Sequence, residues 1–244
     1  MTRRARGPAL RDRLIVALDT ADLREALRLT KRLQGLIRYV KIGSALFTAE
    51  GPEAIRRMRA LGLEVFLDLK FHDIPSTVEK SCRAAVRHRV AMLTVHASGP
   101  RPMLDAAVAG VRDESKRLGI RRPRVVGVTV LTSVGGVASK AIASRVAQLA
   151  GVSHRAGLDG VVASAHEVPL IRRRFGSSLL VVCPGIRPLG TEASDQHRIA
   201  SPRAAIRAGA DCVVVGRPIA QADDPRATTV GILAEIAEGL RDRR

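Results

Sequence analysis

Residues 64–70 read EVFLDLK, an apolar run that ends on a carboxylate and a lysine, and the polar segment FHDIP follows it. The apolar residues are nearly continuous rather than alternating, which is typical of a parallel strand covered by helices. Similar runs recur along the chain at Leu14–Asp19, Tyr39–Gly43, Met92–Ala97, Val125–Leu131, Gly160–Ser164, Leu179–Gly185 and Cys212–Arg217. The sequence therefore predicts eight parallel strands.

Amphipathic stretches of helical length separate these runs, and in Pro52–Leu61 the apolar residues fall on one face. The expected helices cover Ala21–Leu36, Pro52–Leu61, Thr77–Arg89, Pro102–Leu118, Ala141–Ala156, His166–Phe175, Ser201–Ala208 and Thr228–Leu240. Eight strand–helix units predict an α/β fold of the TIM (β/α)8 barrel type, with one catalytic domain over residues 14–244. A doubly wound open sheet is the alternative, but no G-x-G-x-x-G follows the first strand.

Composition excludes several classes of protein. The chain of 244 residues is 46% hydrophobic and 26% charged, which is ordinary for a globular domain. Its apolar runs are too short for a membrane span, and no signal peptide is visible. Three cysteines without C-x-x-C spacing indicate reduced thiols rather than a disulfide frame or a zinc site. We expect a cytoplasmic protein.

The net charge of +18 raises the question of a nucleic-acid partner. The arginines are spread over nearly every expected helix, and aromatic residues make up only 2% of the chain. Both features favour solvated helix faces over an RNA-binding surface. The one local cluster, five arginines within residues 2–13, predicts a basic flexible tail over residues 1–13.

Polar residues end most of the expected strands, where a TIM barrel carries its active site. Period-two geometry puts Asp68 and Lys70 on the same side of their strand, and Asp73 follows in the loop. A lysine between carboxylates stays protonated and can donate a proton to a developing carbanion. The structural alternative is an ion-pair network that only stabilises the mouth of the barrel.

A second signal lies at the last two strands. Gly216 and Arg217 end the eighth strand, and Arg187 opens a polar loop that contains Gln196. TIM barrels often bind phosphate there, through backbone N–H groups and a guanidinium. In so arginine-rich a chain, an arginine at a strand end can also be accidental.

His96 fits a barrel-interior histidine better than a catalytic base, and no histidine pair predicts a metal site.

These motifs, in this order, resemble the bacterial (type 1) orotidine 5′-phosphate decarboxylase family over nearly the whole chain, from about Leu14 to Pro225. The resemblance rests on Ala17-Leu18-Asp19, Val40-Lys41-Ile42-Gly43, Glu50-Gly51-Pro52, residues 66–78 (FLDLKFHDIPSTV), Val95-His96-Ala97, Leu131-Thr132-Ser133, Pro184-Gly185-Ile186-Arg187, Asp195-Gln196-His197-Arg198 and Val215-Gly216-Arg217-Pro218-Ile219. Sugar-phosphate relatives share the D-x-K-x-x-D core, whereas Thr132-Ser133 and Asp195-Gln196 favour the orotidylate enzymes.

The resemblance implies decarboxylation of orotidine 5′-monophosphate to uridine 5′-monophosphate, the last step of pyrimidine synthesis, with no cofactor and no metal. It implies a catalytic array of Lys70, which would protonate C6, with Asp68, Asp73 and Lys41. The implied substrate ligands are Asp19 and Lys41 for ribose, Thr132 for the pyrimidine, Gln196, Gly216 and Arg217 for phosphate, and Arg187 at a closing loop. It also implies a homodimer in which Asp73 and Thr77 reach the neighbouring site.

Two other functions compete with this one. A metal-dependent sugar-phosphate decarboxylase or aldolase of the same superfamily would share the barrel and the charged core. An RNA-binding barrel would account for the charge of +18.

The sequence departs from the family pattern at two serines. Ser76 and Ser201 stand where many family members have threonine, and each keeps the hydroxyl.

Overall fold

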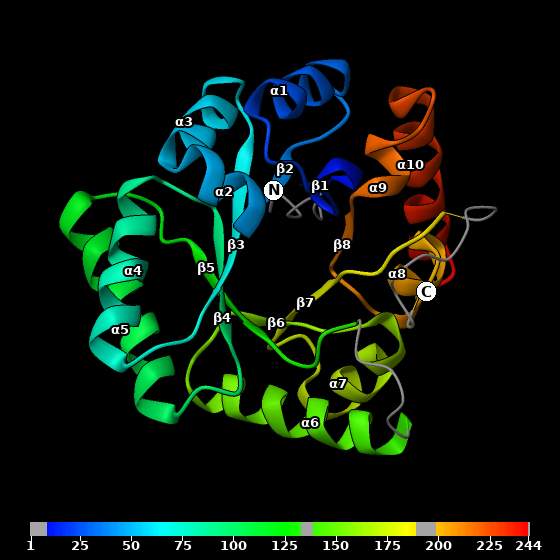
Figure 1. The fold of residues 1–244 in the computed structure, drawn as a ribbon. Coiled ribbons are helices and arrows are strands. Elements are labelled where there is room, and N and C mark those ends of the chain that lie inside the picture. The colour runs from blue at the N-terminus through cyan, green and yellow to red at the C-terminus, as the bar shows by residue number, and fades with distance from the viewer. Residues whose placement is uncertain (1–8, 133–138, 189–198, 244) are drawn as a thin grey trace, which may run out of the picture.

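The structure is a computed structural model that describes residues 9–132, 139–188 and 199–243. Eight parallel strands form a closed barrel in chain order, which confirms the predicted TIM barrel (Figure 1). The strands are β1 (Leu14–Leu18), β2 (Tyr39–Gly43), β3 (Glu64–Phe71), β4 (Met92–His96), β5 (Arg124–Val128), β6 (Gly160–Val162), β7 (Leu180–Cys183) and β8 (Cys212–Val215).

Helices form the outer ring around the strands (Figure 1). They are α1 (Leu23–Arg32), α2 (Ser44–Glu50), α3 (Pro52–Ala60), α4 (Pro75–Arg87), α5 (Arg101–Leu118), α6 (Ser139–Arg155), α7 (Val168–Phe175), α8 (Pro202–Ala208), α9 (Arg217–Ala220) and α10 (Pro225–Arg241), with 3-10 turns η1 (Leu10–Asp12) and η2 (Ala165–Glu167).

The short helices α2 and α9 were not expected from the apolar periodicity. Gly51 has φ +59 and separates α2 from α3, so two helices follow β2 where one was expected. The other differences are the two 3-10 turns and shifts at the ends of strands and helices, with β5 ending at Val128 rather than Leu131. For example, α4 begins at Pro75 rather than Thr77, because proline suits the first helical turn, where its missing N–H costs nothing.

Two apolar clusters bury the two faces of the barrel. The inner cluster fills the barrel with side chains that include Ile15, Phe66, Met92 and Val214. The larger cluster lies between the strands and the helices. Burial on both faces explains why the strands read as continuous apolar runs.

All three cysteines are free and buried, and burial raises the pKa of the Cys82 and Cys212 thiols to about 12.

The start of the described chain packs against the barrel. The Val213 N–H donates to the Arg13 carbonyl at 2.8 Å, and the Arg13 guanidinium donates to the Asp211 carbonyl at 3.2 Å. Arg13, which was expected in a flexible tail, is therefore attached to the barrel. Residues 1–8 lie outside the described part. Within the described ranges, no helix has the length and apolar character needed to cross a membrane.

Candidate active site

A cavity of about 310 Å³ opens at the carboxyl end of the barrel. Its polar lining comes from residues that the sequence had singled out at the strand ends, namely Asp19, Lys41, Asp68, Lys70, Thr132, Arg187, Gly216 and Arg217. Its apolar lining includes Phe66 and Ile186. The tertiary structure thus joins residues from six strands or the loops after them into one site.

The charged side chains at the bottom of this cavity alternate in sign. Lys41 Nζ lies 2.9 Å from Asp19 Oδ1 and 3.6 Å from Asp68 Oδ2. Lys70 Nζ lies 2.9 Å from the same Asp68 oxygen. Asp68 is nearly buried, so its charge needs these two cations and its hydrogen bonds. The result is a continuous chain of charges across β1, β2 and β3.

Lys70 reaches this position through an irregular strand. The pairing of β3 with β4 shifts between Leu67 and Phe71, and Lys70 has a left-handed φ of +52. That conformation costs a non-glycine residue about 1–2 kcal/mol. Asp68 and Lys70 do lie on the same side of the strand, as predicted. The cause is the irregularity of β3 and not the regular alternation on which the prediction was based.

Thr94 on β4 holds this irregularity in place, and it was not among the residues predicted for the site. Its hydroxyl accepts the Lys70 N–H at 2.8 Å and donates to Asp68 Oδ1 at 3.0 Å. Thr94 has no exposed surface. The available signal was its position two residues after Met92 and two before His96, which makes it a polar residue at an inward-facing place.

Two glycines leave the room that the charges need. A Cβ at Gly216 would lie 3.1 Å from Asp19 Oδ2, and a Cβ at Gly43 would lie 3.1 Å from Lys41 Nζ. Both contacts are tighter than ordinary van der Waals packing. A side chain at either place would therefore push against the Asp19–Lys41 pair.

Asp73 and Thr77 lie away from the cavity of their own chain. Both are exposed, and the Asp73 carboxylate accepts the Ile74 N–H at 2.6 Å. In the single described chain, Lys70 makes an ion pair with Asp68 and none with Asp73. The spacing-based expectation that Lys70 lies between both carboxylates is therefore not met within one chain.

His96 lies beside the site and not among the residues that line the cavity. Its ring centroid is 5.3 Å from that of His72. Partial burial, followed by the charges of His72 and Lys70, lowers the His96 pKa, which favours the neutral imidazole.

Gly216, Arg217 and Arg187 line the cavity on the side of β7 and β8. Gln196, which was also expected at the phosphate, lies outside the described residues. Across the described ranges, no group of three or more His, Cys, Asp or Glu side chains could hold a metal ion.

A TIM barrel with paired lysines and aspartates at one side of its carboxyl-end cavity and arginines at the other has the layout of an enzyme for a phosphorylated small molecule. The family model described as "Orotidine 5'-phosphate decarboxylase / HUMPS family" matches residues 12–231. The chain belongs to this family.

Curated relatives agree with that assignment. The orotidine 5′-phosphate decarboxylase of Moorella thermoacetica is 45% identical over 93% of this chain and 92% of its own length. The enzyme of the same name from Halorhodospira halophila is 46% identical over 92% of this chain and 96% of its own. The crystal structure of orotidine 5′-phosphate decarboxylase from Lactobacillus acidophilus has a TM-score of 0.80 at 33% identity, over 91% of this chain and 98% of that one.

Proposed function

We propose that this chain converts orotidine 5′-monophosphate into uridine 5′-monophosphate and carbon dioxide, as the final step of pyrimidine synthesis in the cytoplasm. The observation that carries the proposal is the ammonium of Lys70, held 2.9 Å from Asp68 in the cavity that Arg217 also lines. The names of the curated relatives support the same reaction.

In the proposed reaction the bond between C6 and the carboxylate breaks, and its electron pair stays on C6. Carbon dioxide leaves, and the Lys70 ammonium gives a proton to C6 and regains one from solvent. No part of the pyrimidine ring delocalises this electron pair well, so the protein must stabilise it by charge. A cation already in place next to C6 needs no reorganisation during the reaction.

Asp68 has two functions in this scheme. It fixes the Lys70 ammonium through the 2.9 Å ion pair, and its charge faces the substrate carboxylate. Repulsion between the two carboxylates is relieved when carbon dioxide leaves. Lys41 and Asp19, joined at 2.9 Å, would bind the ribose hydroxyls, and Thr132 the pyrimidine.

Phosphate binding supplies energy far from the reacting carbon. Arg217, Gly216, Gln196 and Arg187 are the proposed ligands of the phosphate. Because the phosphate stays unchanged during the reaction, its binding energy can be used to hold C6 against Lys70.

We infer a homodimer in which Asp73 and Thr77 complete the neighbouring site. In support, both side chains are exposed, and Ile74 between them exposes 64% of an apolar side chain that a partner would cover. Mixing Lys70→Ala with Asp73→Ala subunits tests this. Each heterodimer would contain one intact site, so equal mixing should restore about one quarter of the activity. No restoration in proven heterodimers would place Asp73 in its own subunit's site.

The reaction is tested by following the ultraviolet absorbance of orotidine 5′-monophosphate with purified protein, with and without a chelator. We expect rapid, chelator-insensitive loss that disappears in Lys70→Ala, with the variant still folded by circular dichroism. Substantial turnover by Lys70→Ala would remove the proton-donor role. If the folded wild-type dimer gave no loss, the orotidylate proposal would be wrong, and sugar phosphates with a divalent metal would be tried next.

A further inference from the structure

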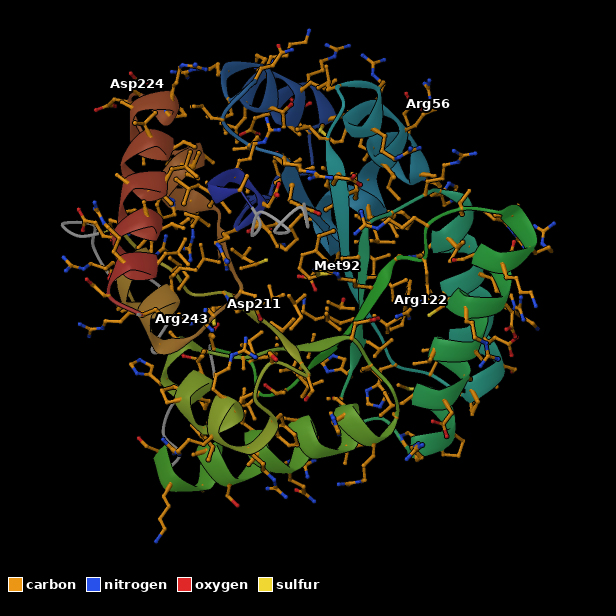
Figure 2. The ribbon with its side chains drawn as sticks, turned by 180° about the vertical axis from the view of Figure 1, so that it is seen from behind. Arg56, Met92, Arg122, Asp211, Asp224 and Arg243 are labelled. Atoms are coloured by element: carbon orange, nitrogen blue, oxygen red, sulfur yellow. The ribbon has the colours of Figure 1, made fainter. Side chains whose placement is uncertain are left out.

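The amino end of the barrel, opposite the site, is also hollow. A cavity of about 370 Å³ and another of about 320 Å³ share Tyr39, Met92, Arg121 and Arg124 in their linings. Figure 2 shows the molecule from behind and labels Met92, Arg122 and Asp211, which belong to these linings. This end is remote from the loop that contains Asp73, because the 13 residues of α4 between them span about 20 Å along the helix axis.

The carboxylates that line these cavities already have cationic partners. Asp12 and Glu64 lie 3.3 and 3.5 Å from Arg38, Asp159 pairs with Arg122, and Asp211 pairs with Arg172. These pairs leave a set of cavity-lining arginines that make no ion pair with any described carboxylate, namely Arg59, Arg89, Arg121 and Arg124. Residues 1–8 contain three more arginines and no acidic residue, so they cannot supply the missing negative charge.

Arg89 occupies a position that glycine fills after most of the other helices. It follows α4 with a left-handed φ of +55, and its N–H bonds to the Val86 carbonyl at 2.8 Å. The residues with positive φ after six other helices are Gly51, Gly62, Gly119, Gly157, Gly176 and Gly209. Here a side chain is strained, and it places a guanidinium at the cavity.

The walls also suit a flat apolar group beside the charges. Tyr39 is half-buried, and the Arg38 guanidinium lies 5.6 Å from the centroid of its ring. Ile15, Met92 and Leu180 line the cavity of about 320 Å³ together with Tyr39. Several guanidiniums next to an aromatic and apolar wall fit a chain of phosphates better than a single phosphate.

We propose that the amino end of the barrel holds a second binding site, for a triphosphate group, either free or carried by a nucleoside. Arg89, Arg121 and Arg124 bind the phosphates, and the wall around Tyr39 and Met92 receives the nucleoside when one is present. This site is separate from the proposed catalytic site and does not depend on its reaction.

Isothermal titration calorimetry with inorganic tripolyphosphate and with ATP tests the site in the full-length protein. We expect saturable binding of one anion per chain at the amino end. Arg121→Ala/Arg124→Ala should weaken it about tenfold or more, because each arginine–phosphate contact is charge-assisted. The control Arg28→Ala/Arg145→Ala removes the same charge from exposed positions outside both cavities and should change the affinity by less than about twofold.

Arg217→Ala separates this site from the catalytic cavity, and the amino-end binding should persist in it. Arg89→Gly should weaken binding while raising Tm, since glycine relieves the left-handed strain. ATP binding tighter than tripolyphosphate would identify the nucleotide as the source of the triphosphate, and equal affinities would identify the phosphate chain alone.

Three results would overturn the proposal. They are no saturable binding, equal weakening by the control pair, or loss of binding in Arg217→Ala alone. Much tighter binding of a single-stranded RNA oligonucleotide, lost in Arg121→Ala/Arg124→Ala, would also overturn it and make this end an RNA surface.

Discussion

The two ends of the barrel carry charge in opposite ways. At the carboxyl end, Asp19, Lys41, Asp68 and Lys70 alternate in sign, and each cation is within 3.6 Å of a carboxylate. At the amino end, the lining carboxylates are ion-paired, whereas several lining arginines form no ion pair with any described residue. The Asp–Lys array is thus balanced within itself, with Arg187 and Arg217 adding positive charge to the same cavity, whereas the amino-end linings contain more arginines than carboxylates.

The choice of cation follows the same division. The chain has six lysines against 35 arginines, yet both cations of the balanced array are lysines. A lysine ammonium is a compact charge that can give up a proton, whereas a guanidinium stays protonated and binds oxyanions through several N–H groups. Net charge alone therefore says little about function, because in the two proposals the same +1 serves proton transfer at one end and anion binding at the other.

The largest effect is expected from Lys70→Arg, which keeps the charge and removes the proton that can be transferred. We expect kcat to fall by about 10³-fold or more, roughly 4 kcal/mol of transition-state stabilisation. Steady-state turnover of orotidine 5′-monophosphate measures it, with Tm as the control for folding. A kcat within about tenfold of wild type would show that charge alone suffices at this position.

Arg217→Ala should have the next largest effect, because it removes a proposed phosphate ligand while leaving the lysine array intact. We expect kcat/KM for orotidine 5′-monophosphate to fall by about 10²-fold. Turnover of orotidine, which lacks the phosphate, should not change. Equal losses on both substrates would mean that Arg217 supports the cavity rather than the phosphate.

Thr94→Val tests whether the hydroxyl that joins Lys70 and Asp68 positions the array. Its loss leaves the Lys70 N–H and one Asp68 oxygen without their partner. We expect kcat to fall by about tenfold with little change in KM, and Thr94→Ser to restore most of it. Equal kcat values for the valine and serine variants would contradict this role.

The smallest effect is expected on stability, from an ion-pair cluster outside the Asp–Lys array in which the arginines do have a carboxylate partner. Glu114 on α5 is almost fully buried and is paired with Arg87 and Arg117 at 2.6 and 2.7 Å. Hydrogen bonds from Arg117 and Arg87 lower the Glu114 pKa from 4.5 to about 2. Its stabilising effect is therefore complete above about pH 4.5 and is lost as the pH falls toward 2.

Thermal unfolding of Glu114→Gln between pH 7 and pH 3 measures this effect. The variant should have the lower Tm at pH 7, and the difference from wild type should shrink as the pH falls. Asp105→Asn, which removes an exposed pair with Arg101 on the same helix, should have a smaller effect. A difference in Tm that is constant with pH would contradict the ionic origin.

Much of the fold was predictable because its periodicity is local. Continuous apolar runs such as residues 64–70 indicate strands buried on both faces, and the count of eight units indicates the barrel. The helices α2 and α9 were missed because they are short and depend on local turns, such as Gly51 at φ +59. The attachment of Arg13 to the barrel was not predictable, because its partners Asp211 and Val213 lie about 200 residues later in the chain.

The fold class and the residue types at the strand ends follow from the order of amino acids alone, since both depend on short-range patterns. How those residues meet depends on the closure of the barrel. The left-handed Lys70, its hydrogen bond to Thr94 and the Lys41–Asp68 contact arise between neighbouring strands. The hollow amino end likewise joins loops that follow different helices. Contacts between distant segments require closure of the barrel, and no local pattern contains that information.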